Sequence, residues 1–295
     1  MSKQRITDAV KGNILISDGA WGTYLHKKGL SSGECPEKWC VDRPEDVLEI
    51  AQSYIDAGSD MIETNSFGGT RFKLEHYDLA DKVSELNEAA AKISSQAAGP
   101  NKWVIASIGP SGKMTVVGDV TNEDFYEGFK AQAIALERGG ADAICVETMS
   151  AIDEATMAIK AAKENTKLEV IATFTFEGSP DGTYNTMMGV TPTEAAKAAI
   201  EAGADIIGTN CGNGFKQMID IVKEMRTVDK NIPILVHANA GLPQNVDGVD
   251  VFPETPEMMA ALVPDIIKAG ANIIGGCCGT TPAHIRAIKE AVMKL

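Results

Sequence analysis

Basic residues are too few in this sequence for a protein that binds phosphate backbones. There are 27 Lys and Arg against 41 Asp and Glu, and the net charge of −14 opposes docking onto nucleic acid or anionic lipid. Long apolar runs are also missing. No stretch approaches the ~18 consecutive apolar residues of a membrane span, and the N-terminal MSKQRITDAVKGN lacks the apolar run of a secretory signal. We therefore expect a cytoplasmic protein with no nucleic-acid or membrane partner.

The sequence shows no linker and no low-complexity tract, which argues against extensive disorder and against a second domain. Hydrophobic residues make up 44% of the 295 residues and charged residues 23%, as in an ordinary globular protein. We expect residues 1–295 to form a single domain around one large core. A homo-oligomer is compatible with this composition.

Short apolar, β-branched runs recur along the chain with amphipathic, alanine-rich helical segments between them. The eight runs begin at Ile14, Met61, Val104, Ala143, Val170, Ile206, Ile234 and Ile273. Continuous apolar runs are typical of parallel strands that are covered on both faces. Eight strand–helix units predict an α/β fold, a single (β/α)8 TIM barrel, with a doubly wound open sheet as the alternative.

One helix-to-strand joint is repeated four times, which supports the repeated unit. The segments YIDAGSDMIETN, LERGGADAICVET, IEAGADIIGTN and IKAGANIIGGC each pass from a helix end through glycine into a strand. Glycine can end a helix in the left-handed conformation without steric cost. The repeat therefore indicates fold and carries no information on function.

Three cysteines follow strands whose C-terminal ends should share one rim of the barrel, where barrel enzymes place their chemistry. Cys211 ends the sixth run, and Cys277 and Cys278 end the eighth. Neighbouring side chains of a regular strand point to opposite faces, so we expect Gly275, Gly276 and Gly279 to let the backbone depart from β geometry.

Three converging thiolates in a reducing compartment favour a zinc site with one open position. A strained redox disulfide of the vicinal pair, or plain packing, are the alternatives; packing is what we expect of Cys145 in the middle of the fourth run. Cys35 and Cys40, in the segment CPEKWC, are interpreted as loop or lid structure with a minor chance of reactivity.

Several motifs together resemble the homocysteine S-methyltransferase family, and most closely the homocysteine-binding barrel of cobalamin-dependent methionine synthase. The resemblance covers residues 18–295. Its motifs are DGAWGT (Asp18 to Thr23), ETNSFGG (Glu63 to Gly69), SIGPSGK (Ser107 to Lys113), VETM (Val146 to Met149), NCG (Asn210 to Gly212), NAGLP (Asn239 to Pro243), TPEMMA (Thr255 to Ala260) and GGCCGTTPAHI (Gly275 to Ile285).

The resemblance implies one Zn²⁺ per chain, bound by Cys211, Cys277 and Cys278, with the sulfur of homocysteine as a further ligand. A free thiol has a pKa of ~8.5, and zinc coordination would convert it into a thiolate nucleophile at neutral pH. Four thiolates around Zn²⁺ carry a net negative charge, which keeps the sulfur reactive toward a methyl electrophile.

The resemblance also assigns substrate contacts. It places the partner of the substrate amine on Glu147. Asp18 is expected to meet the same amine or to brace the first loop, and backbone N–H groups of Gly19, Ala20 and Gly22 are candidates for the substrate carboxylate. Asn210 and Asn239 are expected in the substrate site, chiefly to orient the loops that carry the cysteines.

The sequence departs from the family pattern at His237, before ANAGLP, and at Phe252, before PETP. His237 is an alternative fourth zinc ligand, although a histidine at a strand end is more often a hydrogen-bonded pocket residue.

The methyl donor is expected to come from outside this chain. The sequence ends at Leu295 and contains no Asp-x-His-x-x-Gly corrinoid motif, so we expect no tightly bound organic cofactor. A separate methylcorrinoid carrier protein, bringing methylcobalamin, is the preferred donor; S-methylmethionine or betaine is the alternative. A different acceptor thiol, such as coenzyme M or a selenol, and a non-catalytic homocysteine or methionine sensor are the competing functions.

Overall fold

The computed structural model describes residues 3–246 and 249–295, and its centre is a sheet of eight parallel strands. Their spatial order is β1-β12-β9-β8-β5-β4-β3-β2. The Asp60 N–H donates to the Ile16 carbonyl at 2.6 Å, so β1 and β2 also meet and the barrel is nearly closed. The strands are β1 (Leu15–Ile16), β2 (Met61–Glu63), β3 (Trp103–Ile108), β4 (Ala143–Met149), β5 (Glu169–Phe174), β8 (Ile206–Asn210), β9 (Ile234–Ala238) and β12 (Ile273–Gly276). The predicted TIM barrel and all eight strands are confirmed.

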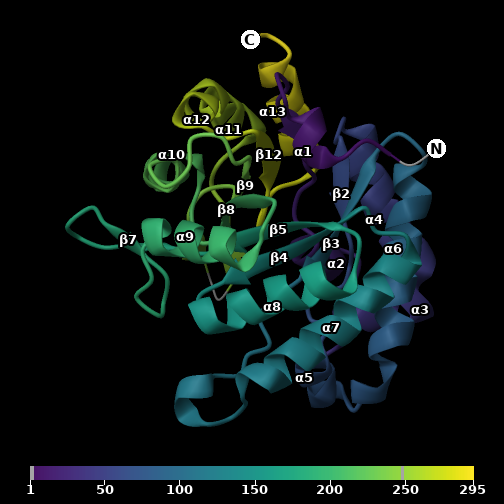
Figure 1. Ribbon diagram of the computed structural model, residues 1–295. Coiled ribbons are helices and arrows are strands. Elements are labelled where there is room, and N and C mark those ends of the chain that lie inside the picture. The colour runs from purple at the N-terminus through teal and green to yellow at the C-terminus, as the bar shows by residue number, and fades with distance from the viewer. Residues whose placement is uncertain (1–2, 247–248) are drawn as a thin grey trace.

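Helices surround the strands (Figure 1). At the four predicted joints Gly58, Gly140, Gly203 and Gly270 have φ of 105°, 99°, 101° and 123°, so glycine is required there, as expected. The outer helices are α4 (Pro44–Asp56), α6 (Val83–Ala98), α7 (Asn122–Gly139), α8 (Ile152–Asn165), α9 (Pro192–Ala202), α10 (Phe215–Met225), α11 (Pro256–Ala261), α12 (Val263–Ala269) and α13 (Pro282–Val292). The short helices α2 (Gly22–Lys27) and α3 (Trp39–Asp42) follow β1, and α5 (Arg71–Leu74) follows β2.

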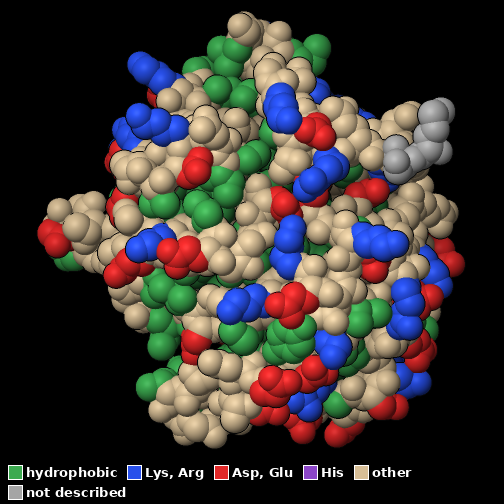
Figure 2. All heavy atoms as spheres, viewed as in Figure 1, with side chains coloured by type: hydrophobic (Ala, Val, Ile, Leu, Met, Phe, Trp, Pro, Cys, Tyr) green, Lys and Arg blue, Asp and Glu red, His purple; other side chains and the backbone are tan. Residues whose placement is uncertain are grey.

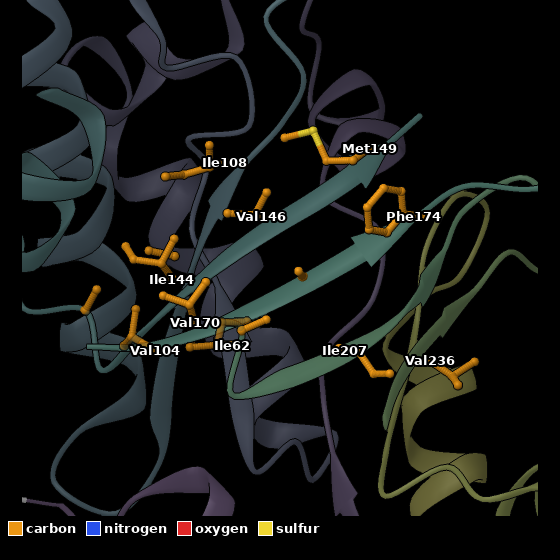
Figure 3. Close-up of a cluster of buried hydrophobic side chains, with 14 of the residues drawn as sticks. Ile62, Val104, Ile108, Ile144, Val146, Met149, Val170, Phe174, Ile207 and Val236 are labelled. Carbon is orange, nitrogen blue, oxygen red and sulfur yellow. The ribbon is translucent and has the colours of Figure 1, made fainter. Parts of the chain in front are cut away.

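Strand alternation divides the buried side chains into two sets. Ile144 and Val146 of β4 belong to the large core between the strands and the helices (Figure 3). Cys145 lies between them in sequence and packs in a second cluster with inward residues of the other strands, which confirms its packing role. Because strand side chains alternate with a period of two, Glu147 follows Cys145 on the inward face. The barrel interior therefore changes from apolar to polar toward the C-terminal ends of the strands.

The N-terminal end of the barrel is covered by α1 (Ile6–Ala9), which the sequence did not predict. Ile6 packs against the inward apolar cluster at the beginnings of the strands. The Glu169 carboxylate accepts hydrogen bonds from the N–H groups of Ile6 at 2.6 Å and Thr7 at 3.1 Å. This cover leaves the opposite end of the barrel for ligand access.

Two hairpins were also not predicted: β6 (Glu177–Gly178) with β7 (Tyr184–Asn185), and β10 (Gln244–Val246) with β11 (Val249–Val251). The first projects from the body of the molecule (Figure 1). Basic and acidic side chains are interspersed on the face shown in Figure 2. Within the ranges that the structure describes, none of the helices has the length and hydropathy needed to cross a bilayer.

Candidate active site

The three predicted cysteines converge at the C-terminal rim of the barrel. The Sγ atoms of Cys211, Cys277 and Cys278 all lie within 4.8 Å of one another, and the Cys211–Cys278 pair is 3.8 Å apart. Tetrahedral zinc with Zn–S bonds of about 2.3 Å places its sulfurs about 3.8 Å apart. The triad therefore fits a zinc site, as predicted.

Backbone geometry after β8 turns the Cys211 side chain toward the other two sulfurs. Cys211 has φ +58°, which is uncommon for a residue other than glycine, and Gly212 follows with φ +70°. The Cys211 N–H donates to the His237 carbonyl at 3.0 Å, and the Asn213 N–H donates to the Cys211 carbonyl at 2.7 Å. At the end of β8, the backbone thus departs from β geometry at Cys211 itself.

The vicinal pair lies just beyond the end of β12, and its glycines act differently from the prediction. Gly275 and Gly276 remain within the strand. A Cβ at Gly276 would lie 2.3 Å from Thr280 Oγ1, so this glycine is required by close packing. Of the three, only Gly279, with φ +80°, departs from β geometry as was expected of all of them. The two cysteines can share a site because both lie outside the regular strand.

The protonation of the triad also suits a cation. Hydrogen bonds from the Cys277 and Cys278 thiols lower the pKa of Cys211 to about 3. The bond to Cys211 raises the pKa of Cys278 to about 12, and that of Cys277 is raised by the same kind of bond. Without a cation the three sulfurs therefore share one negative charge. A divalent ion would stabilise all three as thiolates.

Asn239 lies next to the triad rather than in the substrate cavity. Its side chain hydrogen-bonds to Cys211 and helps to lower the pKa of that thiol. Its Oδ1 is buried and has no hydrogen-bond partner among the described residues. Asn239 therefore supports the thiolate form of Cys211 as a hydrogen-bond donor.

The three cysteines open onto a cavity of about 280 Å³, which is large enough to hold a small amino acid. Glu63 and Glu147 line it together with the backbone of the segment after β1. No Lys or Arg is among the described residues that line this cavity. Its charged groups are therefore sulfurs and carboxylates, which favour a cationic group on the ligand.

Glu147 is buried and is held from two sides. Its Oε1 accepts a hydrogen bond from Ser107 Oγ, and its Oε2 accepts one from Asn210 Nδ2 at 3.1 Å. Burial raises the pKa of Glu147 well above its usual range, and the charge of Glu63 raises it further. The carboxylate is thus rigid and unfavourably charged until a cation approaches it.

Glu63 is the site residue that the substrate assignment missed. It lines the same cavity, and its buried Oε1 has no hydrogen-bond partner among the described residues. His237 Nδ1 lies 3.4 Å from that oxygen. Burial raises the pKa of Glu63 well above its usual range, with a further contribution from the charge of Asp18. The signal was present in the sequence, since Glu63 ends the second strand on the same face as Met61.

Asp18 braces the first loop and does not line the cavity. It is fully buried, and its Oδ2 accepts hydrogen bonds from Trp21 Nε1 and from the Glu63 N–H, both at 2.8 Å. Burial raises the pKa of Asp18, while the charge of His237 opposes that shift. Of its two predicted roles, the structure favours the brace.

The three backbone candidates for a substrate carboxylate differ in their surroundings. Gly19, Ala20 and Gly22 all line the cavity. The Ala20 N–H already donates to Thr280 Oγ1 at 3.1 Å, and a Cβ at Gly19 would lie 2.7 Å from the same oxygen. Gly22 begins α2, and a Cβ there would meet nothing within 4 Å. Gly22 is therefore the most accessible of the three.

The remaining predicted residues lie outside the cavity wall. Asn210 is fully buried behind Glu147, and His237 does not belong to the group of cysteines that could hold a metal. Cys35 is buried, and its thiol donates to Glu37 Oε2 at 3.3 Å; burial raises its pKa to about 12. The Cys40 thiol donates to the Asn65 carbonyl at 3.4 Å. Both thiols are thus protonated; Cys35 lies in the loop as expected, whereas Cys40 lies within α3.

Comparisons with known proteins agree with this geometry. The family profile described as Homocysteine S-methyltransferase matches residues 15–292. Methionine synthase of Mycobacterium tuberculosis (strain ATCC 25618 / H37Rv) is 31% identical over 310 residues, and methionine synthase of Mycobacterium leprae (strain TN) is 30% identical over 308 residues. Each alignment covers 98% of this chain and 25% of the relative, so the chain spans about a quarter of the length of these relatives.

Among solved structures, the homocysteine methyltransferase MmuM from Escherichia coli in its metallated form has a TM-score of 0.80 at 22% sequence identity. The match covers 97% of this chain and 98% of MmuM, and it shows the same fold. The resemblance carried by the sequence motifs is thereby confirmed. The chain belongs to the homocysteine S-methyltransferase family, methyltransferases whose methyl acceptor is homocysteine.

Proposed function

We propose that this chain transfers a methyl group to the thiol of homocysteine, forming methionine, at a zinc ion held by Cys211, Cys277 and Cys278. The observation that carries the proposal is a single cavity of about 280 Å³ whose wall holds three sulfurs and three buried carboxylates, those of Glu37, Glu63 and Glu147. The sulfurs suit the thiol end of the substrate and the carboxylates suit its ammonium end. Bound zinc would supply a thiolate nucleophile at neutral pH.

Glu147 and Glu63 are proposed to bind the substrate ammonium together. Both carboxylates are buried, which raises the pKa of each; the charge of Glu63 raises the pKa of Glu147 further, and the charge of Asp18 raises that of Glu63. An ammonium between them would relieve that repulsion and satisfy the free Oε1 of Glu63. A thiol without an amine would leave both carboxylates without a cationic partner, which gives the site its preference for an amino acid.

The substrate carboxylate is proposed to meet backbone N–H groups at the beginning of α2. Gly22 is the favoured contact because it lines the cavity and has open space around its Cα. The first N–H groups of a helix have no partner within the helix, so they can bind a carboxylate. Gly19 and Ala20 would then shape the turn, and Asp18 would hold it through Trp21.

In the transfer itself, a carbon–sulfur bond forms as the bond between the methyl carbon and the donor breaks, and the electron pair of that bond leaves with the donor. The donor must therefore approach next to the cavity that holds the thiol. A second cavity of about 430 Å³ lies there, and Thr148 lines both cavities. Thr175 also lines the second cavity, and its hydroxyl donates to the Asn210 carbonyl at 2.8 Å.

The outer edge of the second cavity suits a donor that is larger than the cavity. Met187, in the segment between β7 and α9, is 75% exposed, and Val116, on the loop after β3, is 76% exposed. In Figure 2, green apolar surface is visible between the β6–β7 hairpin and the loop after β3. Exposed apolar side chains on both sides of a cavity favour a protein partner. We therefore propose a protein-borne methylcorrinoid as the donor.

The deciding experiment offers the zinc-loaded, reduced protein methylcobalamin, S-methylmethionine and betaine in turn with homocysteine, and measures methionine. Turnover with methylcobalamin alone supports a corrinoid donor. Turnover with S-methylmethionine or betaine would leave homocysteine as the acceptor and would identify that small molecule as the donor in place of a corrinoid. Homocysteine binding without turnover on any donor would instead identify a sensor, and preference for a thiol lacking an amine would refute the acceptor.

The cellular compartment follows from the chemistry of the three cysteines. Cys211, Cys277 and Cys278 are free thiols and can bind zinc only when reduced, so we propose that residues 1–295 act as one catalytic domain in the cytoplasm.

A further inference from the structure

We propose that Asn210 is a positioning residue that holds the Glu147 carboxylate for the substrate ammonium and links it to the metal ligand Cys211. This inference rests on the ammonium-binding role proposed for Glu147. Asn210 is the last residue of β8, it is fully buried, and it does not line the substrate cavity. Its side chain therefore acts through its neighbours.

The Asn210 amide makes four hydrogen bonds, all with residues of β4 and β5. Its Nδ2 donates to Glu147 Oε2 at 3.1 Å and to Thr148 Oγ1 at 2.7 Å. Its Oδ1 accepts from the Thr148 N–H at 2.8 Å and from Thr173 Oγ1 at 2.7 Å. One edge of the amide must donate to a carboxylate while the other accepts from an N–H and a hydroxyl. Only a primary amide supplies both functions at this size.

The backbone at Thr148 explains why such a clamp is needed. Thr148 has φ +60°, which is a genuine outlier for a β-branched residue. The pairing of β4 with β5 also shifts register between Val146 and Met149, on either side of the Glu147–Thr148 pair. Asn210 binds both the N–H and the hydroxyl of Thr148, so it stabilises the distorted backbone that carries Glu147.

Asn210 also connects the Glu147 carboxylate to the metal site. Cys211 follows Asn210 directly, and the Asn210 carbonyl accepts a hydrogen bond from Thr175 Oγ1 at 2.8 Å. A displacement of the Asn210 side chain would move Glu147, and a displacement of its peptide would move Cys211. The distance between the ammonium site and the thiol site is thus fixed by one buried residue.

The test compares two thiols on the zinc-loaded, reduced protein by calorimetry: homocysteine, and 4-mercaptobutanoate, which is homocysteine without its amino group. Asn210→Asp keeps the size and the accepting edge but places an oxygen against Glu147. Thr173→Val is the matched control, because it removes one donor to Oδ1 and leaves the contact with Glu147 in place. Zinc content and the unfolding midpoint are measured on every variant.

We expect Asn210→Asp to weaken homocysteine binding about 10- to 100-fold, to change 4-mercaptobutanoate binding less than about 2-fold, and to retain zinc. Thr173→Val should leave both affinities close to wild type. Equal loss for both thiols, or no loss for either, would overturn the inference.

If Asn210→Asp does not fold, Asn210→Ser removes the same contact without adding a buried charge, and the same ratio is expected. A wild-type protein that does not prefer homocysteine over 4-mercaptobutanoate would refute the role of Glu147 itself. A wild-type preference that persists in both Asn210 variants would refute Asn210 alone.

Discussion

Replacement of Glu147 by Gln tests the substrate assignment most directly, because it removes a charge while keeping the side-chain size. The Ser107 hydroxyl can accept as well as donate, whereas Asn210 Nδ2 can only donate. The amide introduced by the substitution would therefore turn its NH₂ toward Ser107 and its oxygen toward Asn210. Both contacts are kept, so the variant should fold. Loss of the repulsion from Glu63 also favours the folded state.

The cost in affinity follows from the charge that is lost. A hydrogen bond between charged, buried partners contributes about 1.5–3 kcal/mol, which corresponds to a factor of about 10 to 150 in the dissociation constant. We expect Glu147→Gln to weaken homocysteine binding by that factor while the protein keeps one equivalent of zinc. Glu63 limits the loss, because it provides a second carboxylate in the cavity.

The measurement is calorimetric titration of the zinc-loaded variant with homocysteine, together with the metal content by elemental analysis. Glu169→Gln is the matched control: it neutralises another buried carboxylate, at the N-terminal end of the barrel, where Glu169 binds the N–H groups of Ile6 and Thr7. It should lower stability and leave homocysteine affinity unchanged. Homocysteine affinity unaltered by Glu147→Gln in a zinc-replete protein would refute the reasoning.

Three further predictions concern the metal, the glycines and the pH dependence of stability. Cys278→Ala should lose the bound zinc, and retention of one equivalent would contradict the ligand set. Gly276→Ala should lower the free energy of unfolding, measured in urea, by about 1–3 kcal/mol, because the new Cβ would lie 2.3 Å from Thr280 Oγ1. Gly22→Ala is the control and should change that free energy by less than about 1 kcal/mol, because a Cβ there meets nothing within 4 Å. Equal effects of the two substitutions would be inconsistent with the packing. Burial raises the pKa of Glu63 in the folded chain, so its stabilising contribution is present below the unfolded pKa and is lost as pH rises toward the folded pKa. Glu63→Gln should therefore reduce the loss of stability between about pH 5 and pH 8 in the metal-free, reduced protein, and an unchanged slope in urea unfolding would count against it.

Local patterns in the sequence predicted most of the fold because each pattern has a local physical cause. The eight apolar runs became the eight barrel strands, since a strand covered on both faces must be apolar throughout. The glycines at the four joints have positive φ because the helix end requires it. The α1 cover and the two hairpins escaped prediction. Ile6 is buried by distant strands, and the hairpins are too short to show a period.

The candidate site was predictable where topology alone brings residues together. The C-terminal ends of parallel strands meet at one rim, so Cys211 and the Cys277–Cys278 pair had to lie near each other once the barrel was assumed. The reason proposed for their orientation was only partly correct. Gly275 and Gly276 serve close packing, Gly279 does leave β geometry as expected, and on the β8 side Cys211 itself is left-handed.

The sequence by itself determined the barrel, the rim and the identity of the sulfurs, because those depend on periodicity and on strand ends. Only the tertiary structure decided which polar residues face the cavity and which support it. Glu63 lines the cavity and has one oxygen without a hydrogen-bond partner among the described residues, while Asp18 and Asn210 bind other protein groups from behind. The physical reason is that the direction and partners of a buried polar side chain are set by hydrogen bonds from strands far apart in the chain, and no local pattern contains them.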